Sequence, residues 1–155
     1  MAKKKKPSGK RKKFGIPPPK CKAILLCDAV ILDAMTGKTS LIGIFENFMV
    51  RSLPGKSVPA NLFLQLTDGH GKIDLRIEVH DLQADAIIAR AEGPGVGFQD
   101  RLQKINVWIG LPPMPIESEG VYDIVVYAGD SEIDRQQFRA LLRVPSKEDE
   151  DQDEA

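Results

Sequence analysis

The chain has 155 residues, 42% of them hydrophobic, and its 22 basic and 22 acidic side chains cancel formally. A chain of this length can bury roughly two-thirds of its unfolded surface in one domain, and its two cysteines, Cys21 and Cys27, are too few for a disulfide-stapled secreted scaffold. No stretch approaches the roughly 18 consecutive apolar residues of a membrane span, so we expect a soluble, cytoplasmic protein without membrane contact.

The first 22 residues form a basic leader. Eight of the first 13 residues are Lys or Arg, and a Pro17-Pro18-Pro19 run follows. Like charges without apolar periodicity predict a disordered segment over residues 1–22. Such a segment can bind nucleic acid or another polyanion by counterion release, and the alternative is a tail that is merely solvated. The candidate nucleic-acid-binding residues are Lys3, Lys4, Lys5, Lys6, Lys10, Arg11, Lys12 and Lys13.

Residues 23–32 and 39–49 are predicted strands, and the segment between them resembles a phosphate-binding loop. That loop needs G-x-x-x-x-G-K-[ST] between a strand and a helix. Five residues before Gly37 stands Leu32 instead of glycine, and the residues that follow are β-branched or aromatic. We therefore predict a hairpin turn with Gly37 at positive φ, and no nucleotide site at Lys38.

Asp28 is the most unusual acid of the chain. It is flanked by Leu26 and Val30 on the same face of the predicted strand. An edge position or a hydrogen-bonded turn is favoured for this carboxylate over an acid with a raised pKa.

The clearest alternation lies in the middle of the chain. Apolar residues occupy every second position of residues 61–67 and 72–81, which predicts two strands with one buried face each. The Asp68-Gly69-His70-Gly71 turn between them predicts a hairpin. His70 and His80 have no metal-ligand spacing with the cysteines, so no metal site is expected, and His80-Asp81 is interpreted as a solvent-facing pair.

Four further strands are predicted over residues 86–92, 102–111, 120–128 and 133–144. Residues 81–91 are the best candidate for a turn of helix, and Gly93, Gly95 and Gly97 predict a flexible loop without the frame of a dinucleotide site. The single tryptophan, Trp108, is expected to lie mostly in the core. Tyr122, two residues after a glycine at a strand entrance, resembles a tyrosine corner whose hydroxyl bonds to upstream backbone.

Together these segments predict an all-β domain over residues 23–146. About eight strands at this spacing suit an antiparallel, two-sheet, immunoglobulin-like sandwich. Residues 147–155 carry six acids from Glu148 onward and no core-forming residue, so an acidic disordered tail is expected there.

Three stretches also resemble a known family, namely "CDAVILDAMTGKTSLIGIFENF", "LFLQLTDGHGKIDLRIEVHDL" and "EGVYDIVVYAGDSEIDRQQFRALLRV". They are similar to a family of small bacterial proteins known only as a domain of unknown function. The resemblance covers residues 27–144 and implies a compact β-sandwich without an established activity, substrate or cofactor.

Two classes of function remain open from the residues themselves. The first is a non-catalytic binding or adaptor module that presents loops or an edge strand to an unknown protein partner. The second is a hydrolase with an unrecognised site. The sequence offers no catalytic triad, metal cluster or phosphate loop and names no catalytic residue, which favours the binding module without a cofactor.

Overall fold

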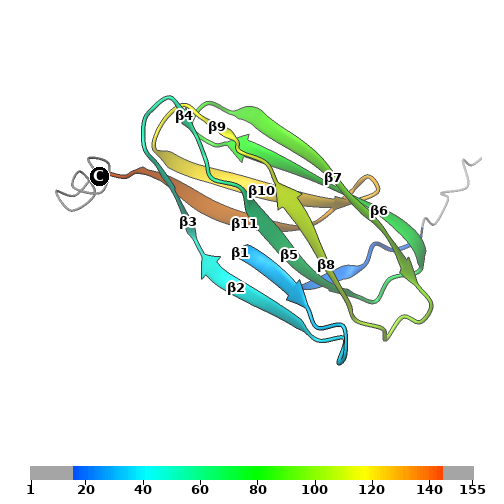
Figure 1. The fold of residues 1–155 in the computed structure, drawn as a ribbon. Coiled ribbons are helices and arrows are strands. Elements are labelled where there is room, and N and C mark those ends of the chain that lie inside the picture. The colour runs from blue at the N-terminus through cyan, green and yellow to red at the C-terminus, as the bar shows by residue number, and fades with distance from the viewer. Residues whose placement is uncertain (1–15, 145–155) are drawn as a thin grey trace, which may run out of the picture.

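The computed structural model describes residues 16–144, which form eleven strands and no helix (Figure 1). The strands are β1 Lys20–Leu32, β2 Thr39–Phe45, β3 Asn47–Val50, β4 Gly55–Lys56, β5 Ala60–Thr67, β6 Gly71–Asp81, β7 Ala86–Phe98, β8 Ile105–Leu111, β9 Pro115–Ile116, β10 Gly120–Ala128 and β11 Ser131–Leu142. The predicted all-β class is confirmed. The basic leader up to residue 15 and the tail from residue 145 lie outside the described residues.

The strands form two main sheets that face each other across one core. The first sheet has the order β2-β1-β5-β8, and the second has the order β3-β11-β10-β6-β7. Strands β4 and β9 make a separate two-stranded ladder at one end. All eight predicted strands are present. The count rises to eleven because β3 separates from β2 and because β4 and β9, with two residues each, are too short to show alternation.

The core consists of the inward faces of both sheets, as the alternation predicted. Leu62, Leu64 and Leu66 of β5 are fully buried, and Leu75, Ile77 and Val79 of β6 are at most 2% exposed. Complete burial of such a side chain contributes about 1.5–3 kcal/mol relative to its exposure. These alternating residues therefore account for the packing of the two sheets against each other.

The predicted hairpin of residues 61–81 is wrong, because β5 and β6 lie in different sheets. Strand β5 pairs with β1 and β8, whereas β6 pairs with β10 and β7. The connecting turn instead carries the chain from one sheet to the other. A side chain at Gly69 would meet the Phe98 ring at 2.3 Å, so glycine is needed where the crossing passes over the core.

The predicted strand of residues 39–49 is divided at Glu46. Strand β2 ends in the first sheet, and β3 continues in the second sheet, parallel to β11. The chain therefore crosses between the sheets at the open side of the sandwich, where β2 leads directly into β3 (Figure 1). This crossing creates the cleft described below.

The glycine-rich segment is not a flexible loop, since β7 extends to Phe98 and pairs Gly95 with Asp74 and Gly97 with Lys72. A side chain at Gly93 would lie 2.9 Å from the Ile109 side chain and 3.0 Å from that of Leu75, so close packing requires glycine there. Pro94 is tolerated because β7 is an edge strand.

Several predicted boundaries and environments also differ. Strand β1 begins at Lys20, inside the predicted leader, because Lys20 pairs with Thr67 and its ammonium lies 3.5 Å from Asp68. Strand β8 begins at Ile105, since the Asp100 carboxylate accepts a hydrogen bond from the Leu102 amide and holds a turn. Trp108 is only partly buried, because it projects from the outer face of its sheet opposite Phe63.

Candidate functional site

The turn at Gly37-Lys38-Thr39 is the predicted hairpin. Asp33 and Lys38 close it through a backbone hydrogen bond of 2.9 Å, and Gly37 has φ +68°. The Asp33 carboxylate accepts hydrogen bonds from the Met35 and Thr36 amides, and these bonds hold the pKa of Asp33 below its usual range. No helix follows, so the frame of a phosphate-binding loop is missing here.

The histidines and cysteines do not assemble a metal site. Among residues 16–144, no group of three His, Cys, Asp or Glu side chains is placed to hold a metal ion. Burial and the nearby Asp134 carboxylate raise the pKa of the Cys21 thiol to about 12, and burial followed by the charge of Asp28 raises that of Cys27. Both thiols are therefore protonated, and thus poor nucleophiles, at neutral pH.

His80 and Asp81 do not form a pair. Successive residues of a strand point to opposite faces, and Asp81 is 2% exposed, which corrects the predicted solvent-facing arrangement. The Asp81 carboxylate accepts hydrogen bonds from the Gln83 and Ala84 amides, so it holds the turn that had been the helix candidate. His80 lies instead beside Glu78, with 3.6 Å between Nε2 and Oε1.

The outer face of the second sheet carries a network of matched charges. Arg90 donates to Glu78 at 3.2 Å, and Arg135 donates to Asp123 at 3.1 Å and to Glu132. Burial disfavours the charge of Glu78, but hydrogen bonds from Arg90 and Tyr127 and the charge of Arg76 leave its pKa below the usual range. Each of the three acids of this network, Glu78, Asp123 and Glu132, therefore has an arginine partner.

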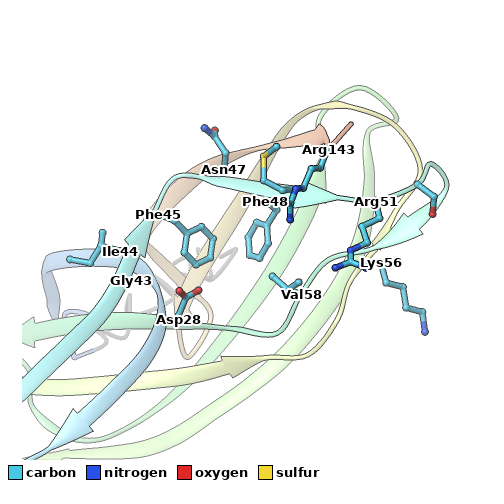
Figure 2. Close-up of a pocket in the computed structure, with 12 residues that line it drawn as sticks. Asp28, Gly43, Ile44, Phe45, Asn47, Phe48, Arg51, Lys56, Val58 and Arg143 are labelled. Atoms are coloured by element: carbon cyan, nitrogen blue, oxygen red, sulfur yellow. The ribbon is translucent and has the colours of Figure 1, made fainter. Parts of the chain in front are cut away.

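The candidate site is a cleft of about 500 Å³ beside the crossing from β2 to β3. This volume lies within the range of about 300–1,000 Å³ of ligand pockets in proteins. It opens between the two sheets, and Figure 2 shows its side chains. Its lining residues are Asp28, Gly43, Ile44, Phe45, Asn47, Phe48, Met49, Arg51, Ser52, Lys56, Val58 and Arg143.

Two aromatic rings form the apolar part of this cleft. Phe45 and Phe48 make an edge-to-face contact with ring centroids 4.9 Å apart, and Phe48 in turn packs edge-on against Phe138 at 4.8 Å. The margin adds exposed apolar side chains, since Ile44 is 57% and Val58 is 56% exposed. A ligand that entered would therefore cover apolar surface that now faces water.

Opposite charges stand on the two sides of these rings. Arg51, Lys56 and Arg143 gather on one side, and Asp28 lies on the other, next to Gly43 and Phe45 (Figure 2). Within residues 16–144, no ion pair joins Arg51, Lys56 or Asp28 to another side chain. These three charges are therefore available to a ligand.

Gly43 allows the carboxylate of Asp28 to reach this position. Asp28 and Gly43 are opposite each other on β1 and β2, and β1 has already passed its last pairing with β5, so Asp28 is at a sheet edge as expected. A Cβ at Gly43 would lie 2.2 Å from the Asp28 carboxylate, and the φ of Gly43 is +67°. Only glycine fits both conditions.

The loop with the two basic residues is held in place by the β4–β9 ladder. Lys56 pairs with Pro115, and Ser57 exchanges two hydrogen bonds of 2.9 Å with Met114. The Arg143 amide donates to the Val50 carbonyl at 2.7 Å, which fixes the end of β11 against β3. The cleft is therefore preformed.

The unusual position of Asp28 is the one feature of the sequence that points to this site. Its lining comes from β1, β2, β3, the loop before β5 and the residue after β11, and its cations are ordinary exposed Arg and Lys residues. The arrangement presents cations, one carboxylate and aromatic surface, a combination that suits the binding of a ligand.

Comparison with known proteins gives the family. Residues 22–141 match a family of unknown function, DUF6941. The chain belongs to this family. The resemblance found in the sequence is thereby confirmed, and membership of DUF6941 brings no assigned activity.

No curated protein matches the chain. Among solved structures, the chain is similar to Pseudomonas fluorescens alkylpurine DNA glycosylase AlkC bound to DNA containing an abasic site analog. The TM-score is 0.44 at 6% identity, and the match covers 76% of this chain and 30% of that chain. A likeness of this size carries no argument about function. Among residues 16–144, no helix is long and apolar enough to cross a membrane.

Proposed function

We propose that this DUF6941 protein is a non-catalytic, cytoplasmic binding module whose cleft takes an extended segment of a partner protein. The segment would combine apolar side chains with carboxylates. The observation that carries this proposal is the apolar surface around Phe45, which is backed by Phe48. It lies between Asp28 on one side and, on the other, two cations without an ion pair within residues 16–144 (Figure 2).

The chemistry of the lining selects this ligand. Residues 23–146 contain 16 acids and 11 bases, so a group of three cations is a local exception on an acidic body. Guanidinium groups bind carboxylates through paired hydrogen bonds, and the apolar part of the cleft favours contact with an apolar side chain. Both β2 and β3 are edge strands, so an extended segment between them also meets backbone donors and acceptors.

The test is fluorescence anisotropy with a labelled, blocked hexapeptide of alternating leucine and aspartate. Arg51→Glu/Lys56→Glu, the cleft variant, should weaken binding at least about tenfold, because attraction becomes repulsion. Lys72→Glu/Lys104→Glu, the control variant, changes the net charge equally at exposed lysines outside the cleft and should bind as the wild type does. Equal affinity of all three proteins, or no binding by any of them, would refute the proposal.

A relationship to immunoglobulin-like sandwiches is part of this proposal. The order β1-β5-β8 corresponds to strands A, B and E of that fold, and β11-β10-β6-β7 corresponds to G, F, C and C′. The Tyr122 hydroxyl donates to the Ser118 carbonyl at 2.6 Å, in the manner of a tyrosine corner. Sandwiches of this type commonly serve as recognition scaffolds, which supports a binding role by analogy.

The basic leader favours a second, independent activity, namely weak binding of nucleic acid or another polyanion without sequence preference. The support is the density of positive charge from Lys3 to Lys13, outside the described residues. A gel-shift titration with duplex DNA should show affinity that falls steeply between about 50 and 200 mM salt. Deletion of residues 2–13 should abolish the shift, and equal binding without the leader would refute this role.

A further inference from the structure

The chain leaves the sandwich at the cleft itself. Strand β11 ends at Leu142, and the next residue, Arg143, lines the cleft. Eleven residues follow Val144, and the acids begin at Glu148, five residues beyond Arg143. The acidic tail, defined as residues 147–155, therefore starts at the margin of the candidate site.

The charges of the acidic tail and the cleft are complementary. The tail carries six carboxylates and a single cation, Lys147. Arg51 and Lys56 have no acidic partner within residues 16–144, although acids outnumber bases on the body of the protein. Of all segments of this chain, the acidic tail offers the highest density of the charge that these cations lack.

The length of chain also suffices. Five extended residues span roughly 17 Å, whereas a cleft of about 500 Å³ is roughly 10 Å across. The tail carboxylates can thus reach Arg51 and Lys56 without any movement of β11. A short tether raises the local concentration of such a ligand to the order of millimolar, so a weak intrinsic affinity is enough.

We propose that the acidic tail docks on Arg51 and Lys56 and acts as a built-in competitor for the cleft, an inference that rests on the proposed function. The tail supplies carboxylates but no large apolar side chain, so it satisfies the cations and leaves the exposed apolar surface of Phe45, Ile44 and Val58 uncovered. A partner segment with both features gains the additional apolar contact and displaces the tail. Acidic segments without apolar side chains gain no contact that the tail lacks, so they should not displace the tail from the cleft.

The direct test observes the tail without any partner. Backbone amide spectra of the full-length protein are compared with those of a neutral-tail variant, in which the six acids from Glu148 to Glu154 are changed to Asn or Gln. Shifts are expected at Arg51, Lys56 and their neighbours, and these should vanish at about 0.5 M salt, where charges are screened within a few ångströms. Identical spectra at the cleft, or shifts confined to other surfaces, would overturn the docking of the tail.

Two further experiments test whether the tail docks on the cleft or pairs with the basic leader, and whether it competes with a ligand. Shifts that disappear when residues 2–13 are deleted would show that the tail pairs with the basic leader, which also overturns the inference. With the labelled hexapeptide, the neutral-tail variant should bind about three- to tenfold more tightly than the wild type at low salt. This gain should be absent in the Arg51→Glu/Lys56→Glu background.

The outcomes for the two proposals can be told apart. Tail-dependent shifts at the cleft without any binding of the hexapeptide would support the docked tail and refute the partner ligand. Binding of the hexapeptide with equal affinity in wild type and neutral-tail variant would support the partner ligand and refute the docked tail.

Discussion

The outer face of the second sheet and the cleft beside β3 use similar side chains in opposite ways. On the sheet face, Arg90 and Arg135 each have an acid within 3.2 Å, and the network lies over Val125, which is fully buried. At the cleft, Arg51 and Lys56 have no such acid among residues 16–144. The matched charges contribute to the stability of the fold, whereas the unmatched charges are those that the proposed ligand would contact.

The largest expected effect tests the first half of this comparison. Glu78→Ala removes the carboxylate shared by Arg76, Arg90 and His80 and should lower the free energy of unfolding by about 2 kcal/mol. The loss stays below that of a fully buried pair because Arg90 is 66% exposed. Urea unfolding at neutral pH measures this loss. A loss below about 0.5 kcal/mol would mean that the network does not contribute to the stability of the fold.

The second prediction concerns the glycine that shapes the cleft. Gly43→Ala should lower the free energy of unfolding by about 1 kcal/mol, because alanine is strained at φ +67°. It should also weaken binding of the hexapeptide, since the new methyl group displaces the Asp28 carboxylate. Gly129→Ala is the matched control, because Gly129 has φ +57° and no atom near its missing Cβ.

Both glycine variants should lose similar stability, and only Gly43→Ala should lose affinity. Unchanged binding of the hexapeptide by Gly43→Ala would exclude Asp28 from the site. Urea unfolding and fluorescence anisotropy on the same protein preparations distinguish these results.

The strand pattern predicted most of the fold but not the crossings between sheets. Alternation in residues 61–81 identified β5 and β6 correctly, yet Asp68-Gly69-His70-Gly71 has the same turn chemistry whether the chain reverses within a sheet or crosses to the other. Pairing with β1 and β10, which are distant in sequence, decides between the two. Local propensity holds no information on that choice.

The cleft could not be predicted from the sequence either, because it also depends on contacts between residues that are distant in sequence. Its position depends on the crossing at Glu46, and its cations come from a loop and from the residue after the last strand. The sequence shows Asp28 as an acid on an apolar strand face, but no local feature places it across the cleft from Arg51. Sites of this kind become visible only when the sheets are assembled.

The third prediction uses pH to sharpen the comparison. Hydrogen bonds from Arg90 and Tyr127 outweigh the burial of Glu78, and the hydrogen bond from Arg135 acts likewise on Glu132, so both folded pKa values lie below their usual range. A carboxyl of this kind stabilises the fold above its unfolded pKa of about 4.3, and this stabilisation is lost as the pH falls through the lower folded value. The network should therefore contribute fully at neutral pH and little in strong acid.

The measurement compares wild type with Glu78→Gln/Glu132→Gln by urea unfolding from pH 7 to pH 3. The difference in the free energy of unfolding should be largest near neutrality and should close below about pH 4. A difference that stays constant over this range would show that ionisation of these two groups does not stabilise the fold.

The smallest expected effect is the most telling for the cleft. Arg51→Glu/Lys56→Glu should change the free energy of unfolding by less than about 0.5 kcal/mol, since neither cation holds an acid among residues 16–144 and both are exposed. The reversal removes repulsion between neighbouring cations but also ends their attraction to the acidic tail, so these two contributions offset each other in the full-length protein. The same variant is expected to lose most of its affinity for the hexapeptide. Large binding loss with unchanged stability is the signature of charges kept for a ligand, whereas a stability loss as large as that of Glu78→Ala would place Arg51 and Lys56 in the fold and remove the distinction between the two regions.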